Sequence, residues 1–534
     1  MMGLFSFNSL TLPAYQPPRD PDEWPKRAEG IRTKFGQPCL WWPKDKGGYH
    51  WSNEELEPYR MIGDGPVDKI LAMLDRPSDS PSPSSFGPSD DLLKLAEAAA
   101  QQQSPHSLSP VEKELASFWQ IYQTLPDWVD VEQLRRGQDV FLAFAPIASL
   151  SLYYRSLVAG FSIPKIAAVV RSTAYLTPPS RPDQVLQRLF DTGELTATCM
   201  GGLGVESILP GGIGWRTALH VRVLHAKVRR ALLLRSKQRA WNVEKYGIPI
   251  NQEDMAATLL GFSVNVLFGI DYVSGSYLPV QDKLDYLALW RYIGWLLGVE
   301  TSSDQERTND EPLMSDLPPL DPCGPGPHHD DSVAKERQPS HTSPMSTINN
   351  AGSLLQSIIF HLVDPDETSV EVAHHLLKIT NRRPPSQKFD KIPTDFYENE
   401  LFYYRAFQCR RFIGDPLADA LGLPLHPKFW IRVKVYLKST FFLSLFRIYA
   451  LTSMWVPFLR RRIIQWHRKH FLVFHETWKA SHPSKMARAL RRNERPSCIV
   501  DEDDKHEDGK AADKDETGRL ARSVCPFPMV APPQ

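Results

Sequence analysis

Apolar residues recur at helical spacing through most of this chain, and clean two-residue alternation is scarce. The stretch from Leu134 to Val170 is apolar nearly all round, which is typical of buried helices. Further helices are predicted at Arg181 to Cys199, Trp215 to Arg235, Gln252 to Leu267 and Leu284 to Leu297. No Asn-Gly or Asp-Gly pair joins two apolar runs, so the usual hairpin signal is missing. The pattern predicts an all-α protein.

Acidic residues mark the expected starts of several helices. Asp64 and Asp415 each end a similar hexapeptide, YRMIGD and RRFIGD, and each precedes a proline and an apolar helical pattern. We expect both to cap helices rather than to mark a repeat. In GIPINQED, Asn251 is the predicted N-cap, and Glu253 and Asp254 suit the positive end of the helix dipole.

Three stretches are rich in Ser, Pro and Asp and poor in apolar residues, and such segments do not recover the entropy lost on ordering. We expect disorder over most of 77–110, apart from a short helix near Leu92 to Gln103, over 301–346, and over 501–534. The parts between them are an N-terminal extension (1–76), a core (111–300) and a C-terminal helical part (347–500). Deletion of 301–346 should then leave the core folded.

Composition excludes some classes of protein. The 62 basic and 62 acidic side chains cancel, which argues against a nucleic-acid partner. Six cysteines without a Cys-x-x-Cys pair indicate reduced thiols in an intracellular protein, and the N-terminus lacks the features of a signal peptide. His328, His329, Asp330 and Asp331 either hold a metal or, as their polar surroundings favour, form a solvated loop.

The chemistry is concentrated in the predicted helix WRTALHVRVLHAKVRRALLLR. Arg222, His225 and Arg229 share one face of it, since they stand at i−3, i and i+4. Two cations beside a histidine lower its pKa, so the cluster is unfavourable unless it meets an anionic, metal-containing partner. The ring would then ligate iron and the arginines would meet propionates or buried carboxylates. An exposed basic face with an incidental histidine is the alternative. His220 lies too far round the helix to share a metal with His225.

Three motifs resemble a known family. RVLHAKVR, GIPINQEDMAATLLGFS and YLALWRYIGWLLGV follow one another as in the catalytic domain of rubber oxygenases and the mycophenolic-acid pathway oxygenase. The likeness covers roughly residues 130–300, with a fainter match at 412–424. It implies a globin-like helical core that binds haem b. By the same resemblance, His225 ligates the iron, and Arg222 and Arg229 hold haem carboxylates.

The resemblance also implies a distal side to the haem. Arg188 and Thr192 match an arginine and threonine that would face dioxygen. Asp191 stands where rubber oxygenases have a lysine, and Ser172 lies near the position of their glutamate. The expected activity is oxidative cleavage of an apolar, alkene-bearing, isoprenoid-like or polyisoprenoid substrate. The alternatives are a non-catalytic haem or lipid carrier at membranes and a helical scaffold without cofactor.

Residues 439–470 are the part of the sequence that indicates possible membrane association. Ser439 to Leu459 is about long enough to span a bilayer, but Arg447 lies near its centre. Arg460, Arg461 and Arg462 follow it, with Trp455 and Trp466 nearby. A buried helix, an interfacial helix and a true span all remain open. Because some relatives are bound to the endoplasmic reticulum, the resemblance favours peripheral contact with that membrane.

Overall fold

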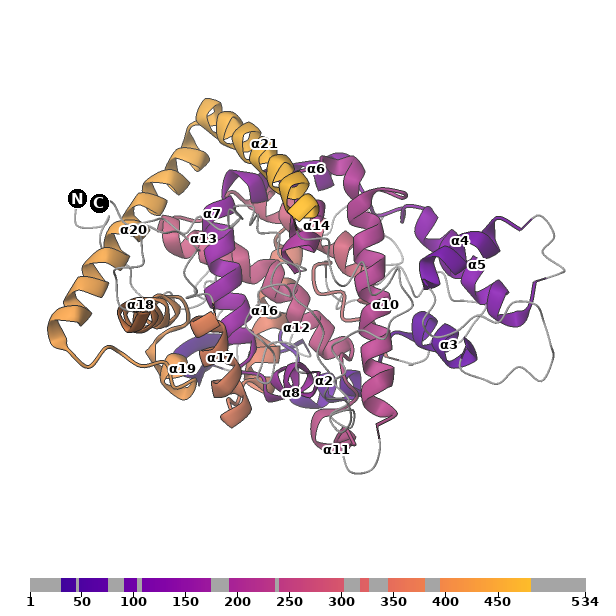
Figure 1. Cartoon of the computed structure of the whole chain (residues 1–534), viewed down its shortest axis with the longest axis horizontal. Coiled ribbons are helices and arrows are strands. Elements are labelled where there is room, and N and C mark those ends of the chain that lie inside the picture. Colours follow the sequence, from indigo (N-terminus) through magenta and orange to yellow (C-terminus); the bar gives the residue numbers. More distant parts are fainter. Residues whose placement is uncertain are drawn as a thin grey trace, which may run out of the picture.

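Helices form nearly all of the regular structure (Figure 1). The structure is a computed structural model and describes residues 30–44, 48–74, 91–102, 108–173, 192–235, 240–301, 317–325, 344–379 and 394–481. The α-helices of these parts are α2 Asn53–Leu56, α3 Gly65–Leu74, α4 Leu92–Ala100, α5 Pro110–Gln123, α6 Val131–Ala143, α7 Ala145–Leu150, α8 Pro164–Ser172, helix 192–199, α10 Ile213–Leu233, α11 Val243–Tyr246, α12 Gln252–Phe262, α13 Val264–Ser274, α14 Val280–Leu296, α16 Pro344–Leu362, α17 Glu367–Ile379, α18 Thr394–Ile413, α19 Asp415–Ala420, α20 Phe429–Trp455 and α21 Pro457–Ser481. Two 3₁₀ helices, η4 Glu57–Met61 and η7 Val205–Ile208, and a π-helix, η6 Ser151–Val158, complete them.

The all-α prediction is confirmed, with one small exception. Strands β1 Gly30–Lys34 and β2 Gln37–Trp41 form an antiparallel hairpin. Its two turn residues, Phe35 and Gly36, both have positive φ, at 48° and 69°, as a tight hairpin turn requires. The sequence signal was missed because phenylalanine takes the place of the usual Asn or Asp. The globin-like arrangement remains a prediction.

The core is built around α14, which packs against α6, α10 and α16. Three tryptophans of this region, Trp215, Trp290 and Trp295, are almost completely buried. The pair α4 and α5 lies at one end of the molecule and is joined to the rest through α3 and α10 (Figure 1). At the other end, α20 and α21 meet in a corner. Helix α10 therefore lies between the main core and the α3–α5 group.

Two predicted helical stretches are broken in the structure. The chain from 134 to 170 divides into α6, α7, η6 and α8, and it bends by 80° near Phe144, just before Pro146. Proline interrupts a helix because it lacks an N–H donor. Between α12 and α13, Ser263 leaves helical geometry, and its hydroxyl bonds to the carbonyl of Leu259 at 2.8 Å. These breaks let the apolar helices wrap around α14.

The short helix expected near Leu92 to Gln103 is α4, and its buried face packs on α5. It is part of the core, although it lies within a segment that we expected to be mainly disordered. Residues 75–90 and 103–107 of that neighbourhood lie outside the described residues. The predicted helix at 181–199 is described only from 192 onward.

The prediction that 301–346 is a disordered insert is wrong for its middle part. Residues 317–325 are ordered against the core, and Leu320 and Cys323 are buried. Asp321 forms an ion pair with Arg291, with an Nε–Oδ1 distance of 2.9 Å. The side chain of Asn350 donates to the carbonyls of Asp321 and Gly324. A few apolar side chains and one charge anchor this proline-rich strip. His328, His329, Asp330 and Asp331 lie outside the described residues.

The predicted helix starts are present, but the aspartates do more than cap them. Asp64 precedes α3, yet its carboxylate mainly binds Arg222, and its contact with the Val67 N–H is 3.5 Å long. Asp415 is the first residue of α19, and its carboxylate pairs with Arg410 at 2.9 Å. Ion pairing therefore takes precedence over capping at both positions.

By length and composition alone, one described helical stretch, Gln252–Ser274, could cross a membrane, and up to three could if each bent helix pair is one span. The bent pairs are α6 with α7–η6, and α20 with the first part of α21. In Gln252–Ser274, 72% of the most apolar window is buried inside the protein. The apolarity of that stretch is thus explained by the core.

Candidate functional site

Helix α10 carries the histidine singled out by the sequence. The helix is 21 residues long and contains no glycine or proline beyond Gly214, its second residue. Its apolar side chains pack against α14 and η7. Its Arg222, His225 and Arg229 occupy neighbouring positions of one face, as the spacing predicted. Both arginines are buried, whereas the histidine is half-buried. This face is turned toward the start of α3 and the 249–252 segment, where both guanidinium groups find their partners.

Arg222 is bound by a carboxylate of the protein itself. Its Nε and one terminal nitrogen donate to the two oxygens of Asp64 at 2.6 and 2.8 Å, and its other terminal nitrogen bonds to the hydroxyl of Tyr122. A bidentate pair of this kind is among the strong hydrogen-bonded contacts in proteins. Gly298, with φ +87°, lies so close that a Cβ there would come within 2.7 Å of the pair. The loop after α14 therefore closes over this ion pair.

Arg229 is likewise bound by a carboxylate of the protein, together with two backbone carbonyls. One terminal nitrogen donates to both oxygens of Asp68 at 2.8 Å, and the other donates to the carbonyl of Ile250 at 2.6 Å. Its Nε donates to the carbonyl of Pro249 at 3.1 Å. Ile250 has φ +55°, which is rare for a β-branched residue. This strained conformation belongs to the turn that presents two carbonyls to one guanidinium group.

The two arginines therefore meet carboxylates of the chain, the buried Asp64 and the partly exposed Asp68, and carboxylates of the chain were one of the two alternatives that the helix spacing left open. Asp64 and Asp68 both lie at the start of α3, so the two ion pairs tie α3 to α10 near His225. The guanidinium groups are already fully engaged in this structure. The expectation that they hold haem carboxylates is not supported by these contacts.

The side chain of His225 has the properties of a metal ligand. Its Nδ1 is buried and has no hydrogen-bond partner among the described residues. The pKa of the ring is lowered to about 4, mainly by burial and also by the nearby Arg229, with Asp64 acting in the opposite direction. The imidazole is therefore neutral at pH 7, and a neutral imidazole is the form that binds a metal. These properties fit a haem iron, which needs only one protein ligand on this side.

No group of three or more His, Cys, Asp and Glu side chains within the described ranges is arranged to hold a metal ion by itself. The His220 Nε2 lies 3.4 Å from an oxygen of Asp91. A metal at His225 would have to arrive with most of its ligands, as a haem iron does.

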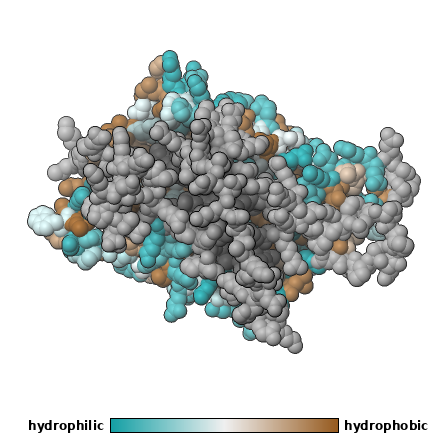
Figure 2. All heavy atoms as spheres, viewed as in Figure 1, coloured by the Kyte–Doolittle hydropathy of each residue, from teal (hydrophilic) through white to brown (hydrophobic). Residues whose placement is uncertain are grey.

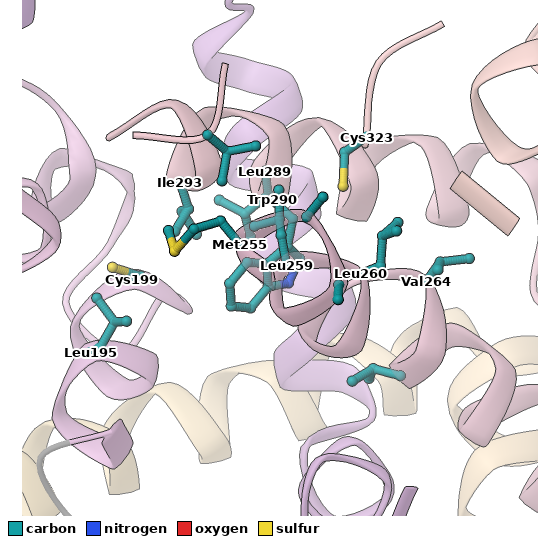
Figure 3. Close-up of a cluster of buried hydrophobic side chains, with 14 of the residues drawn as sticks. Leu195, Cys199, Met255, Leu259, Leu260, Val264, Leu289, Trp290, Ile293 and Cys323 are labelled. Carbon is teal, nitrogen blue, oxygen red and sulfur yellow. The ribbon is translucent and has the colours of Figure 1, made fainter. Parts of the chain in front are cut away.

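The predicted distal residues are only partly visible. Arg188 and Asp191 lie outside the described residues, and Thr192 is exposed at the start of helix 192–199. The same helix places Leu195 and Cys199 in an apolar cluster with residues of α12 and α14 (Figure 3). The labelled members of that cluster include Met255, Leu259, Trp290 and Ile293. The roles of Arg188 and Thr192 stay predictions.

Ser172, where the family has a glutamate, ends α8. Its carbonyl accepts a hydrogen bond from Arg235, just beyond α10, at 2.7 Å. This contact ties the end of α8 to the helix that carries His225.

Sequence reasoning missed a buried charge network at the start of α12. Lys165 of α8 lies 2.5 Å from Glu253 and 3.1 Å from Asp254. His361 of α16 contacts the other oxygen of Glu253 at 2.6 Å. Asn251 caps the helix as predicted, by accepting from the Asp254 N–H. Glu253 and Asp254 are buried and join three helices, so their role exceeds compensation of the helix dipole. The sequence signal for this network was Lys165, a charged residue within an otherwise apolar predicted helix.

A concave site also lies away from His225. A cavity of about 310 Å³ between α18 and α20 is lined by Tyr403, Phe407, Leu425, Phe429 and Tyr436, among others. Its walls are mainly aromatic and apolar. It shares no residue with the α10 face, so it is not the binding place implied by the histidine.

The fold and this histidine define the class of the protein as all-α with a candidate metal ligand. Comparison with known proteins identifies the family within that class. The profile described as "ER-bound oxygenase mpaB/B'/Rubber oxygenase, catalytic domain" matches residues 143–440, more than half of the chain. The chain therefore belongs to this family of oxygenases. Among solved structures, it is similar to a latex clearing protein in the closed state, with 17% identity and a TM-score of 0.46, over 80% of this chain and 95% of that one. No curated protein matched the chain.

Proposed function

We propose that this protein is a haem-dependent oxygenase that uses dioxygen to cleave a C=C bond of an apolar, isoprenoid-like substrate. Membership of the oxygenase family supports the reaction class. The observation that carries the cofactor assignment is His225, whose buried Nδ1 has no partner among the described residues and whose lowered pKa keeps the ring neutral. The proposed ligand of the haem b iron is His225.

A bound haem would supply the iron centre that activates dioxygen for addition to the alkene. The overall reaction balances without another reductant, since one alkene and one dioxygen yield two carbonyl products. The chain would contribute a neutral imidazole at His225, presented from a helix that a buried and a partly buried ion pair hold in place. Arg222 and Arg229 are then positioning residues. Arg188 and Thr192 remain the proposed hydrogen-bond donors toward dioxygen, where charge develops in the reaction.

The first test concerns the cofactor. Wild-type protein purified with haem should show a Soret band, and His225→Ala should lose it while the far-ultraviolet circular dichroism stays unchanged. His220→Ala is the matched control, because this second histidine of α10 is paired with Asp91 and should retain the haem. If a folded His225→Ala variant keeps its haem content and spectrum, the ligand assignment is wrong.

The second test concerns the reaction. Reduced holoprotein is exposed to oxygen with a panel of terpenoid and polyisoprenoid alkenes, and aldehyde or ketone fragments are sought by mass spectrometry. Arg188→Ala should slow product formation without releasing the haem. The non-catalytic carrier is the second candidate, favoured by Asp191 and Ser172 in place of the family's lysine and glutamate. Haem binding without turnover of any alkene would support the carrier.

A further inference from the structure

Among the described residues, none covers the outer side of α20, where a series of large apolar side chains is exposed. One row of positions at helical spacing contains Trp430, Leu437, Phe441, Leu445, Ile448 and Trp455. These six side chains are between 47% and 78% exposed. From Trp430 to Trp455 the row is about 37 Å long at the helical rise per residue. An apolar row of this length, in which Lys434 stands between Trp430 and Leu437, indicates an interaction surface, since single exposed apolar residues need no such explanation.

We propose that this row, together with the first turns of α21, docks the protein onto the surface of an anionic lipid membrane. We call this the α20–α21 face; it comprises the six residues above with Phe458, Leu459, Arg461, Arg462 and Trp466. Figure 1 shows α20 along one edge of the molecule, meeting α21 in a corner. Hydrophobic and hydrophilic side chains lie beside one another at that corner (Figure 2).

The inner side of α20 argues against a simple bilayer span. It packs against α13 and α18, and its buried residues include Ser439, Ser453 and Arg447. The Arg447 Nε donates to the carbonyl of Val273 at 3.2 Å, and the Ser453 hydroxyl donates to the carbonyl of Ala143 at 3.1 Å. These polar contacts belong to a helix packed on protein. Because α20 is buried on one side and apolar on the other, it suits the plane of a membrane surface.

The charge of this region selects the kind of surface. Residues 429–475 contain no Asp or Glu and nine Lys or Arg, whereas the whole chain has a net charge of zero. Several of these cations have acidic partners elsewhere, such as Arg460 with Asp282 and Arg468 with Asp139. Arg461, Arg462 and Lys469 are exposed. Cations beside exposed tryptophans are the composition that binds anionic lipid headgroups.

The same charge argues against a second copy as the occupant. A two-fold symmetric dimer would place the same patch on both sides of the interface. Arg461 and Arg462 would then approach their own copies, with no acidic residue between 429 and 475 to compensate them. An anionic lipid surface supplies both the missing negative charge and an apolar layer.

The test measures binding of the full chain to vesicles by sedimentation. We expect binding to phosphatidylcholine vesicles that contain about one third phosphatidylserine, and much weaker binding to pure phosphatidylcholine. Raising the salt concentration from about 0.05 M to about 0.5 M should weaken the binding, since the shorter screening length removes the electrostatic part. This assay does not depend on haem or turnover, so it can fail while the proposed reaction holds.

Two double variants separate the apolar and the electrostatic contributions. Leu437→Ser/Leu445→Ser should lower the partition coefficient roughly tenfold or more, because two half-exposed leucines no longer enter the lipid. Arg461→Gln/Arg462→Gln should lower it by about tenfold at low salt and little at high salt. The matched control is Leu233→Ser/Leu234→Ser, which removes two leucines of similar exposure at the end of α10. The control should bind like wild type.

Four results would overturn the proposal. Equal binding to neutral and anionic vesicles would show that the basic residues do not contribute to docking. Equal binding by the Leu437→Ser/Leu445→Ser variant and its control would remove the role of the α20–α21 face. A protein that resists extraction from membranes by alkaline carbonate, or a dimer that dissociates on Leu437→Ser/Leu445→Ser in sedimentation without vesicles, would assign the face to a span or to a second copy.

Discussion

The ion pair between Arg222 and Asp64 provides a quantitative test of how α10 is held. Both side chains are about 5% exposed, and two hydrogen bonds of 2.6 and 2.8 Å join them. Replacing only Asp64 by Leu leaves a buried guanidinium group with Tyr122 as its remaining side-chain partner. The structure predicts that this single change is among the most destabilising substitutions near the site.

The magnitude follows from the cost of an uncompensated buried charge. Removing one partner of a buried pair costs about 3 to 5 kcal/mol, whereas replacing both partners by apolar residues is often close to neutral. We therefore expect Asp64→Leu and Arg222→Met each to lower the free energy of unfolding by about 3 kcal/mol or more, and the double variant to recover most of the loss. A natural domain has only about 5 to 15 kcal/mol of stability in total.

The assay is a double-mutant cycle measured by denaturant unfolding, followed by circular dichroism, with the haem content recorded for each variant. A coupling energy below about 0.5 kcal/mol would refute the pairing, because separate sites behave additively at that level. The haem readout tests the role of Arg222. If the double variant is as stable as wild type but no longer binds haem, Arg222 holds a haem carboxylate and is not a positioning residue.

Two further predictions concern stability. Asp321→Leu should lower the free energy of unfolding by about 3 kcal/mol in thermal or denaturant melts, because Arg291 loses its buried partner; a change within about 0.5 kcal/mol would show that 317–325 is not part of the core. In haem-free protein, the pKa of His225 is lowered to about 4, so the unfolded chain binds the extra proton between that value and about 6.5. Stability should therefore fall by about 2 to 3 kcal/mol as the pH drops through this window, and the part due to His225 should be absent in His225→Gln.

Local patterns were sufficient for the helices and for the position of the histidine. Helical periodicity depends on neighbours three and four residues away, so α10, α12 and α14 could be placed from the sequence. The shared face of Arg222, His225 and Arg229 follows from helix geometry alone. The breaks within longer stretches were missed because hydrophobic patterning continues across Pro146 and Ser263, although both residues permit a bend.

Composition gave a wrong prediction of disorder where a few tertiary contacts hold a polar segment on the core. The window 301–346 is polar and rich in proline on average, yet nine residues within it, 317–325, pack on the core. Their order depends on Arg291 and Asn350, which lie outside the window. An average over a window does not register such anchors.

The sequence alone determined the class of fold, the candidate ligand His225 and the family resemblance, because each is written in residues close to one another along the chain. Only the tertiary structure decided what surrounds them. Asp64 reaches Arg222 across 158 positions of sequence, so the arginine meets a carboxylate of the chain, which is one of the two alternatives that its spacing left open. Likewise, the apolarity of α20 is visible in the sequence, but its exposed side is the one that α13 and α18 leave uncovered. Burial and ion pairing are long-range properties, so they appear only when distant segments are brought together.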